Sequence, residues 1–173
     1  TTTLSDSTYT ADIILESNDP DEGSVSINLT GSAATNITLY VPTEYATIQT
    51  AIDSAYSGDT IQVAVGTYME NIVFSAVDIV LRGEGADSTI LDGNNVGAVI
   101  TLTADQTSAT QIKHLTVTGG NAATGGGIAA YTATPVISHV IVHGNTATTS
   151  GGGIYLEGNG TLNHVTVYGN TSS

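Results

Sequence analysis

The sequence predicts an all-β solenoid, in which short parallel strands stack coil on coil after a β-hairpin and one short helix. The main observation is a repeat: residues 112–117, 137–142 and 162–167 carry the same phrase, and each copy begins 25 residues after the previous one. A fixed period of this length is typical of repeat proteins, whose units bury their apolar faces only against their neighbours. Within each copy, apolar residues alternate at the period of two that a strand with one buried face requires.

The segments between these strands favour turns over helices. They contain Gly119-Gly120, Gly144-Asn145 and two Gly-Gly-Gly-Ile runs, at 125–128 and 151–154, and glycine tolerates positive φ while weakening a helix. Without a crossover helix, about 25 residues suit one solenoid coil. These runs and the Gly-Asn turns resemble the repeats of right-handed parallel β-helix proteins of the pectin-lyase-like superfamily, in particular surface and secreted adhesins. The resemblance covers about residues 42–173 and implies a right-handed parallel β-helix.

Three histidines, His114, His139 and His164, occupy the same place in each copy. The period would stack them in a column at about 4.8 Å, the spacing of adjacent strands. A zinc site needs about four ligands that converge from different directions, and the chain has no cysteine. In the resembling family an Asn ladder occupies such a turn, and His shares with Asn an enrichment at positive φ. We therefore favour a structural ladder over a metal site.

Composition limits the partners. The chain has 173 residues, a formal net charge of −14 and two basic residues, Arg82 and Lys113. Nucleic acids and anionic membranes are bound through clustered Lys and Arg, so both are poor partners. The sequence has no apolar run of 18 residues, so membrane insertion is not expected. The lack of cysteine fits an exported protein or a reducing compartment. The sequence starts without Met or signal peptide, which suggests a mature or excised chain, and we expect an extracellular or cell-surface location.

Residues 1–39 are expected to form a β-hairpin that is either an immunoglobulin-like remnant or an assembly arm. Strand patterns at 9–17 and 24–30 flank a loop rich in turn residues. Ser-Asn-Asp-Pro at 17–20 resembles the signature of the last hairpin in a Hydin-type immunoglobulin-like domain. Two strands alone are marginally stable. We therefore expect either that the chain is cut from a longer polypeptide, or that the hairpin finds its missing strands on its own solenoid or on a neighbouring subunit.

The hairpin loop also offers a candidate calcium site. Asn18, Asp19, Asp21 and Glu22 supply oxygen ligands within five positions. They lack the twelve-residue spacing with a terminal Glu that defines a hand-type site. We therefore favour a solvated turn and expect no cofactor.

Residues 40–58 are expected to form a linker and a capping helix, followed by the coils of residues 59–173. A helical pattern spans residues 42–58, with Thr43 as its cap, Gly58 as its stop and apolar residues at helical spacing: Ile48, Ala51, Ile52 and Ala55. The resembling family places such a helix across the N-terminal mouth of the solenoid. The first coil would otherwise expose unpaired strand groups and core side chains.

Catalysis is not expected, although the resembling superfamily includes enzymes that cleave acidic polysaccharides. Hydrolases need paired carboxylates about 5 to 9.5 Å apart, lyases need a cationic base, and Arg82 and Lys113 are the only candidates for that base. A strongly negative surface also repels a polyanionic substrate. For a polysaccharide lyase, the runner-up interpretation, the catalytic set to test is Arg82, Asp78 and Asp92.

Polysaccharide binding without cleavage is a further alternative. Tyr131 and Tyr155 are 24 residues apart, close to one period, and Tyr168 lies on the next coil. Sugars stack on aromatic rings, but an aromatic ladder that reinforces the solenoid explains the spacing as well, and we favour it.

The sequence thus indicates a non-catalytic, acidic, extracellular structural protein. Its last coil stops within a turn at residues 169–173, and an exposed parallel edge pairs readily with more strand. Truncation, further coils beyond the given residues and a partner that stacks there would each explain this edge. Our hypothesis is that copies of the chain join head to tail into a filament or surface adhesin, through a contact that need not close.

Overall fold

The computed structural model describes residues 7–15, 25–33, 36–74, 77–103 and 106–173. The chain forms two compact units, Thr1–Thr35 and Asn36–Ser173. The sequence placed the end of the hairpin region at residue 39. The structure assigns residues 36–39 to the solenoid instead, because β3 (Thr38–Val41) pairs in parallel with β4 (Thr60–Val63).

The first unit contains a two-stranded antiparallel ladder. Strand β1 (Ser7–Leu15) pairs with β2 (Val25–Ala33) along its whole length, from Ser7 opposite Ala33 to Leu15 opposite Val25. The hairpin predicted from the turn-rich loop is therefore present, with each strand shifted by one or more residues from the expected bounds.

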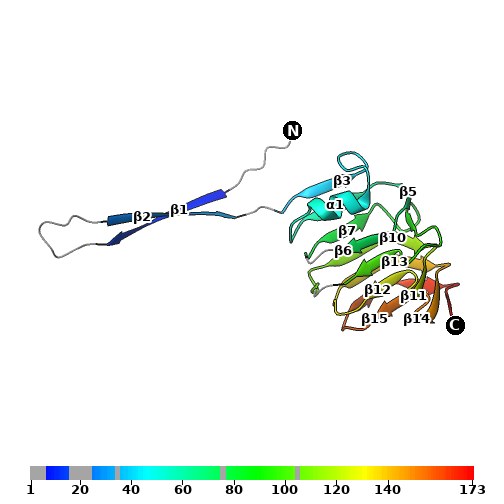
Figure 1. Ribbon diagram of the computed structural model, residues 1–173. Helices are drawn as coiled ribbons and strands as arrows, with labels where there is room; N and C mark the ends of the chain where they lie inside the picture. The colour runs from blue at the N-terminus through cyan, green and yellow to red at the C-terminus, as the bar shows by residue number, and fades with distance from the viewer. Residues whose placement is uncertain (1–6, 16–24, 34–35, 75–76, 104–105) are drawn as a thin grey trace, which may run out of the picture. The chain divides into compact units, whose positions relative to one another are not determined.

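The second unit is a parallel β-solenoid of about five turns, which confirms the predicted all-β fold (Figure 1). Its longest sheet stacks the first strands of successive coils: β3, β4, β7 (Val80–Gly83), β10 (Gln111–Thr118), β13 (Val136–His143) and β16 (Thr161–Asn163). The same sheet is joined by β5 (Gly66–Met69), β8 (Thr89–Asp92) and β17 (Thr166–Tyr168).

Two smaller parallel sheets complete each coil. One contains β6 (Ile72–Phe74), β9 (Ile100–Leu102), β12 (Ile128–Ala130) and β15 (Ile154–Leu156). The other contains β11 (Asn121–Thr124), β14 (Thr146–Ser150) and β18 (Thr171–Ser172). Every coil therefore presents a strand to each neighbour on several sides.

Alternation along the strands fills the solenoid with apolar side chains. Ile61 of β4, Leu81 of β7, Ile112 of β10 and Ile137 of β13 are register partners, and all four are fully buried. Burial of such a side chain stabilises a protein by about 1.5–3 kcal/mol. Because every rung adds a residue to this column, the inward faces supply most of the cohesion between coils.

The capping helix is shorter than predicted. Helix α1 (Ile48–Ser54) buries Ile48, Ala51 and Ile52, as the apolar spacing indicated, but its N-cap is Thr47 and not Thr43. Thr47 Oγ1 accepts the backbone N–H of Thr50 at 3.1 Å, while residues 42–44 form a turn. The helix also ends earlier, with Ala55 as its C-cap in place of Gly58. The helical pattern thus predicted the buried face correctly and both ends wrongly.

Candidate functional site

The three periodic histidines form a stacked column on the solenoid surface. The ring centroids of His114 and His139 are 4.9 Å apart, as are those of His139 and His164, with interplanar angles of 20° and 10°. All three have positive φ, between 51° and 57°, and each interrupts the alternation of its strand segment at a corner. Parallel rings cannot converge on one ion, and within the described ranges no group of three His, Asp or Glu residues could hold a metal.

His114, the first histidine of the column, has a lowered pKa. Burial, together with the nearby His139, Arg82 and Lys113, lowers the pKa of His114 below its ordinary 6.5. Both basic residues of the chain therefore lie beside the column. Arg82 and Lys113 are direct register partners on β7 and β10, and Lys113 Nζ donates to Gln111 Oε1 at 3.0 Å.

A second ladder, built from asparagine, lies inside the corner after the main strands. Asn145 is 1% exposed, and its Oδ1 accepts the N–H of Gly120, one coil earlier, at 2.8 Å. Asn170 Oδ1 in turn accepts the N–H of Asn145 at 3.0 Å. Asn145 Nδ2 donates to the carbonyls of Val117 and His143 and to Asn170 Oδ1, at 2.9 to 3.1 Å. Each corner amide is thus satisfied by the next coil.

The sequence interpretation missed this asparagine ladder. Gly144-Asn145 and Gly169-Asn170 were treated as turns, although they are one 25-residue period apart and Gly120 occupies the preceding position. The signal was present in the period. The ladder was missed because turn propensity alone does not reveal whether an Asn side chain bonds its own turn or the neighbouring coil.

The residues considered for catalysis occupy separate structural positions. Asp78 precedes β7 and accepts hydrogen bonds from Thr107 N–H, Thr107 Oγ1 and Thr110 Oγ1, at 2.7 to 2.8 Å. Burial raises the pKa of Asp78, but these hydrogen bonds outweigh it and lower the pKa below the ordinary 3.8. Asp92, at the end of β8, accepts the N–H of Asn94 at 2.8 Å in a local turn. Both carboxylates therefore stabilise local backbone structure through hydrogen bonds, Asp78 at Thr107 and Thr110 and Asp92 at Asn94.

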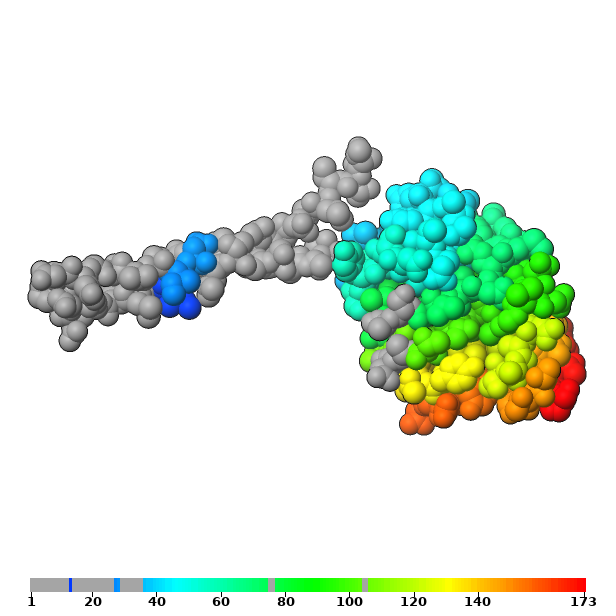
Figure 2. All heavy atoms as spheres, viewed as in Figure 1, coloured from blue at the N-terminus to red at the C-terminus, as the bar shows by residue number. Residues whose placement is uncertain are grey.

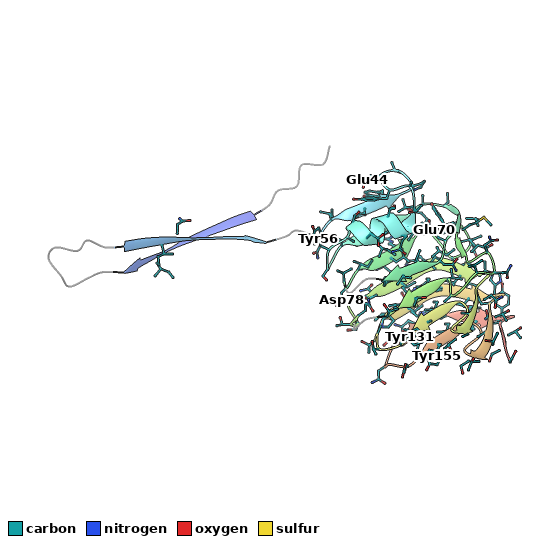
Figure 3. All side chains as sticks on the ribbon, in the orientation of Figure 1. Glu44, Tyr56, Glu70, Asp78, Tyr131 and Tyr155 are labelled. Carbon is teal, nitrogen blue, oxygen red and sulfur yellow. The ribbon has the colours of Figure 1, made fainter. Side chains whose placement is uncertain are left out.

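The tyrosines divide between two faces. Tyr131 and Tyr155 are neighbours on successive coils, with ring centroids 5.9 Å apart and a tilt of 52° (Figure 3). Tyr168 is not part of that pair: it stacks on His143, its register partner in β13, at 5.1 Å and 14°. The predicted proximity of Tyr131 and Tyr155 is thus confirmed, and Tyr168 belongs to a separate His–Tyr stack.

An outward column of polar side chains runs along the main sheet. Its members are successive register partners, about 4.8 Å apart, and all are exposed or partly exposed: Tyr40, Gln62, Arg82, Lys113, Ser138 and Asn163. The column begins with an aromatic ring and carries both cations at its centre. We call it the polar column.

The first coil has its strand edges covered. The Tyr40 N–H of β3 donates to Glu44 Oε2 at 3.1 Å, and the Tyr40 carbonyl accepts the Glu44 N–H at 2.9 Å. Gln49 of α1 bonds both backbone groups of Val73 in β6, at 2.8 and 3.1 Å. The Glu70 carboxylate accepts the first two N–H groups of α1, at 3.0 and 3.1 Å. Figure 3 labels Glu44 and Glu70 beside the helix.

The last coil is exposed by contrast. Leu162, the register partner of buried Ile137, is 46% exposed, and Val167, the partner of buried Val142, is 51% exposed. Figure 2 shows this coil, in orange and red, at the opposite end of the solenoid from the cyan first coil and α1. From residue 106 onward, Lys113 and Glu157 are the only Asp, Glu, Lys or Arg residues. We call the surface formed by residues 161–173 the last-coil face; it has no Asp, Glu, Lys or Arg, and Leu162 and Val167 are exposed on it among polar residues.

Comparisons with known proteins do not place the chain in a family. No family model matches it, and no curated protein matches it either. The chain is thus defined by its fold, as a parallel β-solenoid of repeated coils. The candidate calcium ligands Asn18, Asp19, Asp21 and Glu22 lie outside the described residues. In the described part of the chain, no helix has the length and apolar character needed to cross a membrane.

Proposed function

We propose that the chain is a non-catalytic structural module whose repeated coils build a stiff rod. The supporting observation is the use of its most distinctive polar residues. The His114, His139 and His164 rings stack on one another, and the Asn145 and Asn170 amides bond one coil to the next. Stacked ladders of this kind reinforce a solenoid along its axis. In the same proposal, the module is a right-handed β-helix of the pectin-lyase-like type, and its hairpin is of the Hydin type.

Self-association is the second part of the proposal, and it involves the last-coil face. Leu162 and Val167 continue buried columns and are themselves about half exposed, so covering them with another apolar surface is favourable. Little charge opposes this contact, because Lys113 and Glu157 alone are charged from residue 106 onward. In the head-to-tail mode, the strand edges at Tyr40 and Val73 would have to exchange their present side-chain partners for those of another copy.

Light scattering over a concentration series, with negative-stain microscopy, tests this part. We expect association that Leu162→Lys abolishes, because a cation in an apolar contact is costly. Val65→Lys makes the same charge change on an exposed apolar residue of an early coil, 64% exposed against 46% for Leu162, and should leave association unchanged. A chain that stays monomeric at every concentration would exclude self-assembly.

A further variant distinguishes the two modes of assembly. Gln49→Leu removes the amide that bonds both backbone groups of Val73 and so opens the edge of β6. If copies join head to tail, this variant should lengthen the filaments. If two last-coil faces meet, the particles should stay dimeric.

We propose an extracellular or cell-surface location for the module. The support is compositional: only 10% of residues are charged and Gly is abundant, while the absence of Cys fits both an exported protein and a reducing compartment. An antibody against the solenoid should label intact cells of the source organism. Labelling only after permeabilisation would contradict the location.

Polysaccharide binding is a second candidate function, supported by the polar column. It offers one aromatic ring, three neutral polar side chains and two adjacent cations in register, and it is long enough for a linear chain of several sugars at about 4.8 Å per rung. Binding of carboxylated oligosaccharides that Arg82→Gln weakens, with neutral oligosaccharides unaffected, would support it. Release of unsaturated products would favour lyase activity instead.

A further inference from the structure

The loop between β15 and β16 contains the one Asn-Gly dipeptide of the chain, Asn159-Gly160. Asparagine is a thermolabile residue. When glycine follows it, the glycine nitrogen can reach the side-chain carbonyl carbon of the asparagine, because glycine has no Cβ to obstruct the approach and adopts the required backbone angles freely. This dipeptide therefore has the greatest intrinsic tendency in the chain to lose its side-chain amide.

The structure leaves both reacting groups of the dipeptide unrestrained. Asn159 is exposed and Gly160 is partly exposed. Among the described residues, none forms a hydrogen bond with the Asn159 side chain or with the Gly160 N–H. The loop is anchored on either side instead, because the N–H groups of Glu157 and Thr161 each donate to a carbonyl of the previous coil, at 2.9 Å. Rotation of the two reacting groups toward each other therefore breaks no hydrogen bond of theirs.

The comparable groups elsewhere in the solenoid are held in place. Asp92-Gly93, the one Asp-Gly dipeptide of the chain, could close the same kind of ring. However, the Gly93 N–H donates to the Thr118 carbonyl at 2.9 Å, and Asp92 Oδ1 accepts a backbone N–H of its own turn at 2.8 Å. The ladder residues Asn145 and Asn170 precede threonine, and their amides donate to carbonyls of the neighbouring coil. Asn159-Gly160 is thus distinguished by its structure as well as by its sequence.

We propose that Asn159-Gly160 is a site of self-modification, at which the chain deamidates without an enzyme. The Gly160 nitrogen loses its proton and attacks the side-chain carbonyl carbon of Asn159. The new C–N bond closes a succinimide ring, and the side-chain nitrogen takes up a proton and leaves as ammonia. Water then adds to either ring carbonyl and reopens the ring, which gives aspartate or isoaspartate at position 159. Nothing is oxidised or reduced, and water is the only co-reactant.

The product is more acidic than the starting chain. From residue 106 onward the charged side chains, with His neutral, are Lys113 and Glu157, one of each sign, so the new carboxylate gives this part of the chain a net negative charge. Isoaspartate also adds a methylene to the backbone close to β16, whose three residues pair with β13. We therefore expect anion exchange to separate the modified molecules, and the isoaspartate form to hold β16 less firmly.

Incubation of the full chain at neutral and at mildly alkaline pH, followed by anion exchange and peptide mapping by mass spectrometry, tests the proposal. The amide of Asn159 should become an acid before any other asparagine of the chain does, and both aspartate and isoaspartate should be found there. An isoaspartate-specific methyltransferase should label the aged chain. Because the attacking nitrogen must first lose its proton, the rate should rise with pH.

Gly160→Ala is the decisive variant. The added Cβ obstructs the attack, and it is tolerated by the fold, since its closest neighbour is Leu156 Cδ1, at 3.2 Å on the end of a side chain. Deamidation at Asn159 should slow several-fold. Asn159→Gln keeps an amide but needs a larger ring, so position 159 should stay unmodified over the same period. The matched control is Glu157→Gln, an exposed change in the same loop, which should leave the rate close to that of the original chain.

Circular dichroism of each variant before incubation shows whether a changed rate follows from unfolding. The proposal is overturned if Asn159 stays intact throughout, if folded Gly160→Ala deamidates as fast as the original chain, or if isoaspartate accumulates at Asp92 faster than at Asn159.

Discussion

Asn145→Asp is the sharpest test of the asparagine ladder. The substitution keeps the size of the side chain and keeps Oδ1, which accepts the Gly120 N–H. It replaces Nδ2, whose two N–H groups are shared among three acceptors, by an oxygen that would face the carbonyls of Val117 and His143 and Asn170 Oδ1. Since Asn145 is 1% exposed, water cannot compensate for the lost donors.

The expected loss of stability depends on pH. Two donor groups lost at about 1 kcal/mol each give a deficit of about 2 kcal/mol at pH 7, or roughly 6 °C in Tm. Burial among acceptors raises the pKa of the new carboxyl, so the folded variant binds its proton more tightly than the unfolded one does. The deficit relative to the original chain should therefore shrink as pH falls from 7 toward about 4.5.

Urea unfolding followed by circular dichroism across that pH range measures the deficit. Asn170→Asp is the control: Asn170 is only partly buried, and its Nδ2 donates to the carbonyls of Val142 and Tyr168, so its deficit should be smaller. The ladder argument would be refuted if Asn145→Asp cost nothing at pH 7, or if its deficit grew on acidification.

Three further predictions concern other contacts. Gly126→Ala places a Cβ 2.6 Å from the Gly152 carbonyl oxygen, so it should cost about 2 kcal/mol, seen as a lower urea midpoint. Because the folded state lowers the pKa of His114, stability should fall as pH drops below about 6.5; His114→Asn, which tolerates the φ of 57°, should flatten that decline. Asp78 has a lowered pKa despite burial, so its contribution to the free energy of unfolding is present above about pH 3.8 and lost below. Asp78→Asn should therefore flatten the acid side of the curve of stability against pH. An unchanged slope in either variant would contradict the role given to that residue.

The sequence predicted the later coils well because their period is regular. Positions 111, 136 and 161 open β10, β13 and β16 at a constant spacing, so inward columns could be assigned from one phrase. The earlier coils open at residues 38, 60, 80 and 111, at unequal spacing. Insertions such as the 93–99 turn, which contains the positive-φ residues Asn94 and Asn95, hide that period.

The first coil shows why local patterns were insufficient there. Thr43 is followed by a helical pattern, but Glu44 bonds the backbone N–H and carbonyl of Tyr40 at the edge of β3. The helix therefore begins only after Thr47, where Thr47 and Thr50 form a capping box. Strand β3 itself is only four residues long, and its strand character depends on pairing with β4. Long-range pairing of this kind cannot be deduced from propensity.

The backbone hydrogen bonds of the asparagine ladder all run in one direction along the solenoid axis. The backbone N–H of Gly120 donates to Asn145, and that of Asn145 donates to Asn170, so each of these two N–H groups depends on the following coil. Detachment of a later coil removes the acceptor of a backbone N–H in the coil before it, whereas loss of an earlier coil removes only a side-chain contact, that of Asn145 Nδ2 with the Val117 carbonyl, and leaves the Asn145 N–H bonded to Asn170. Deuterium uptake at these two amides should therefore be faster for Asn145 than for Gly120, and stretching the chain should unzip it upward, coil after coil.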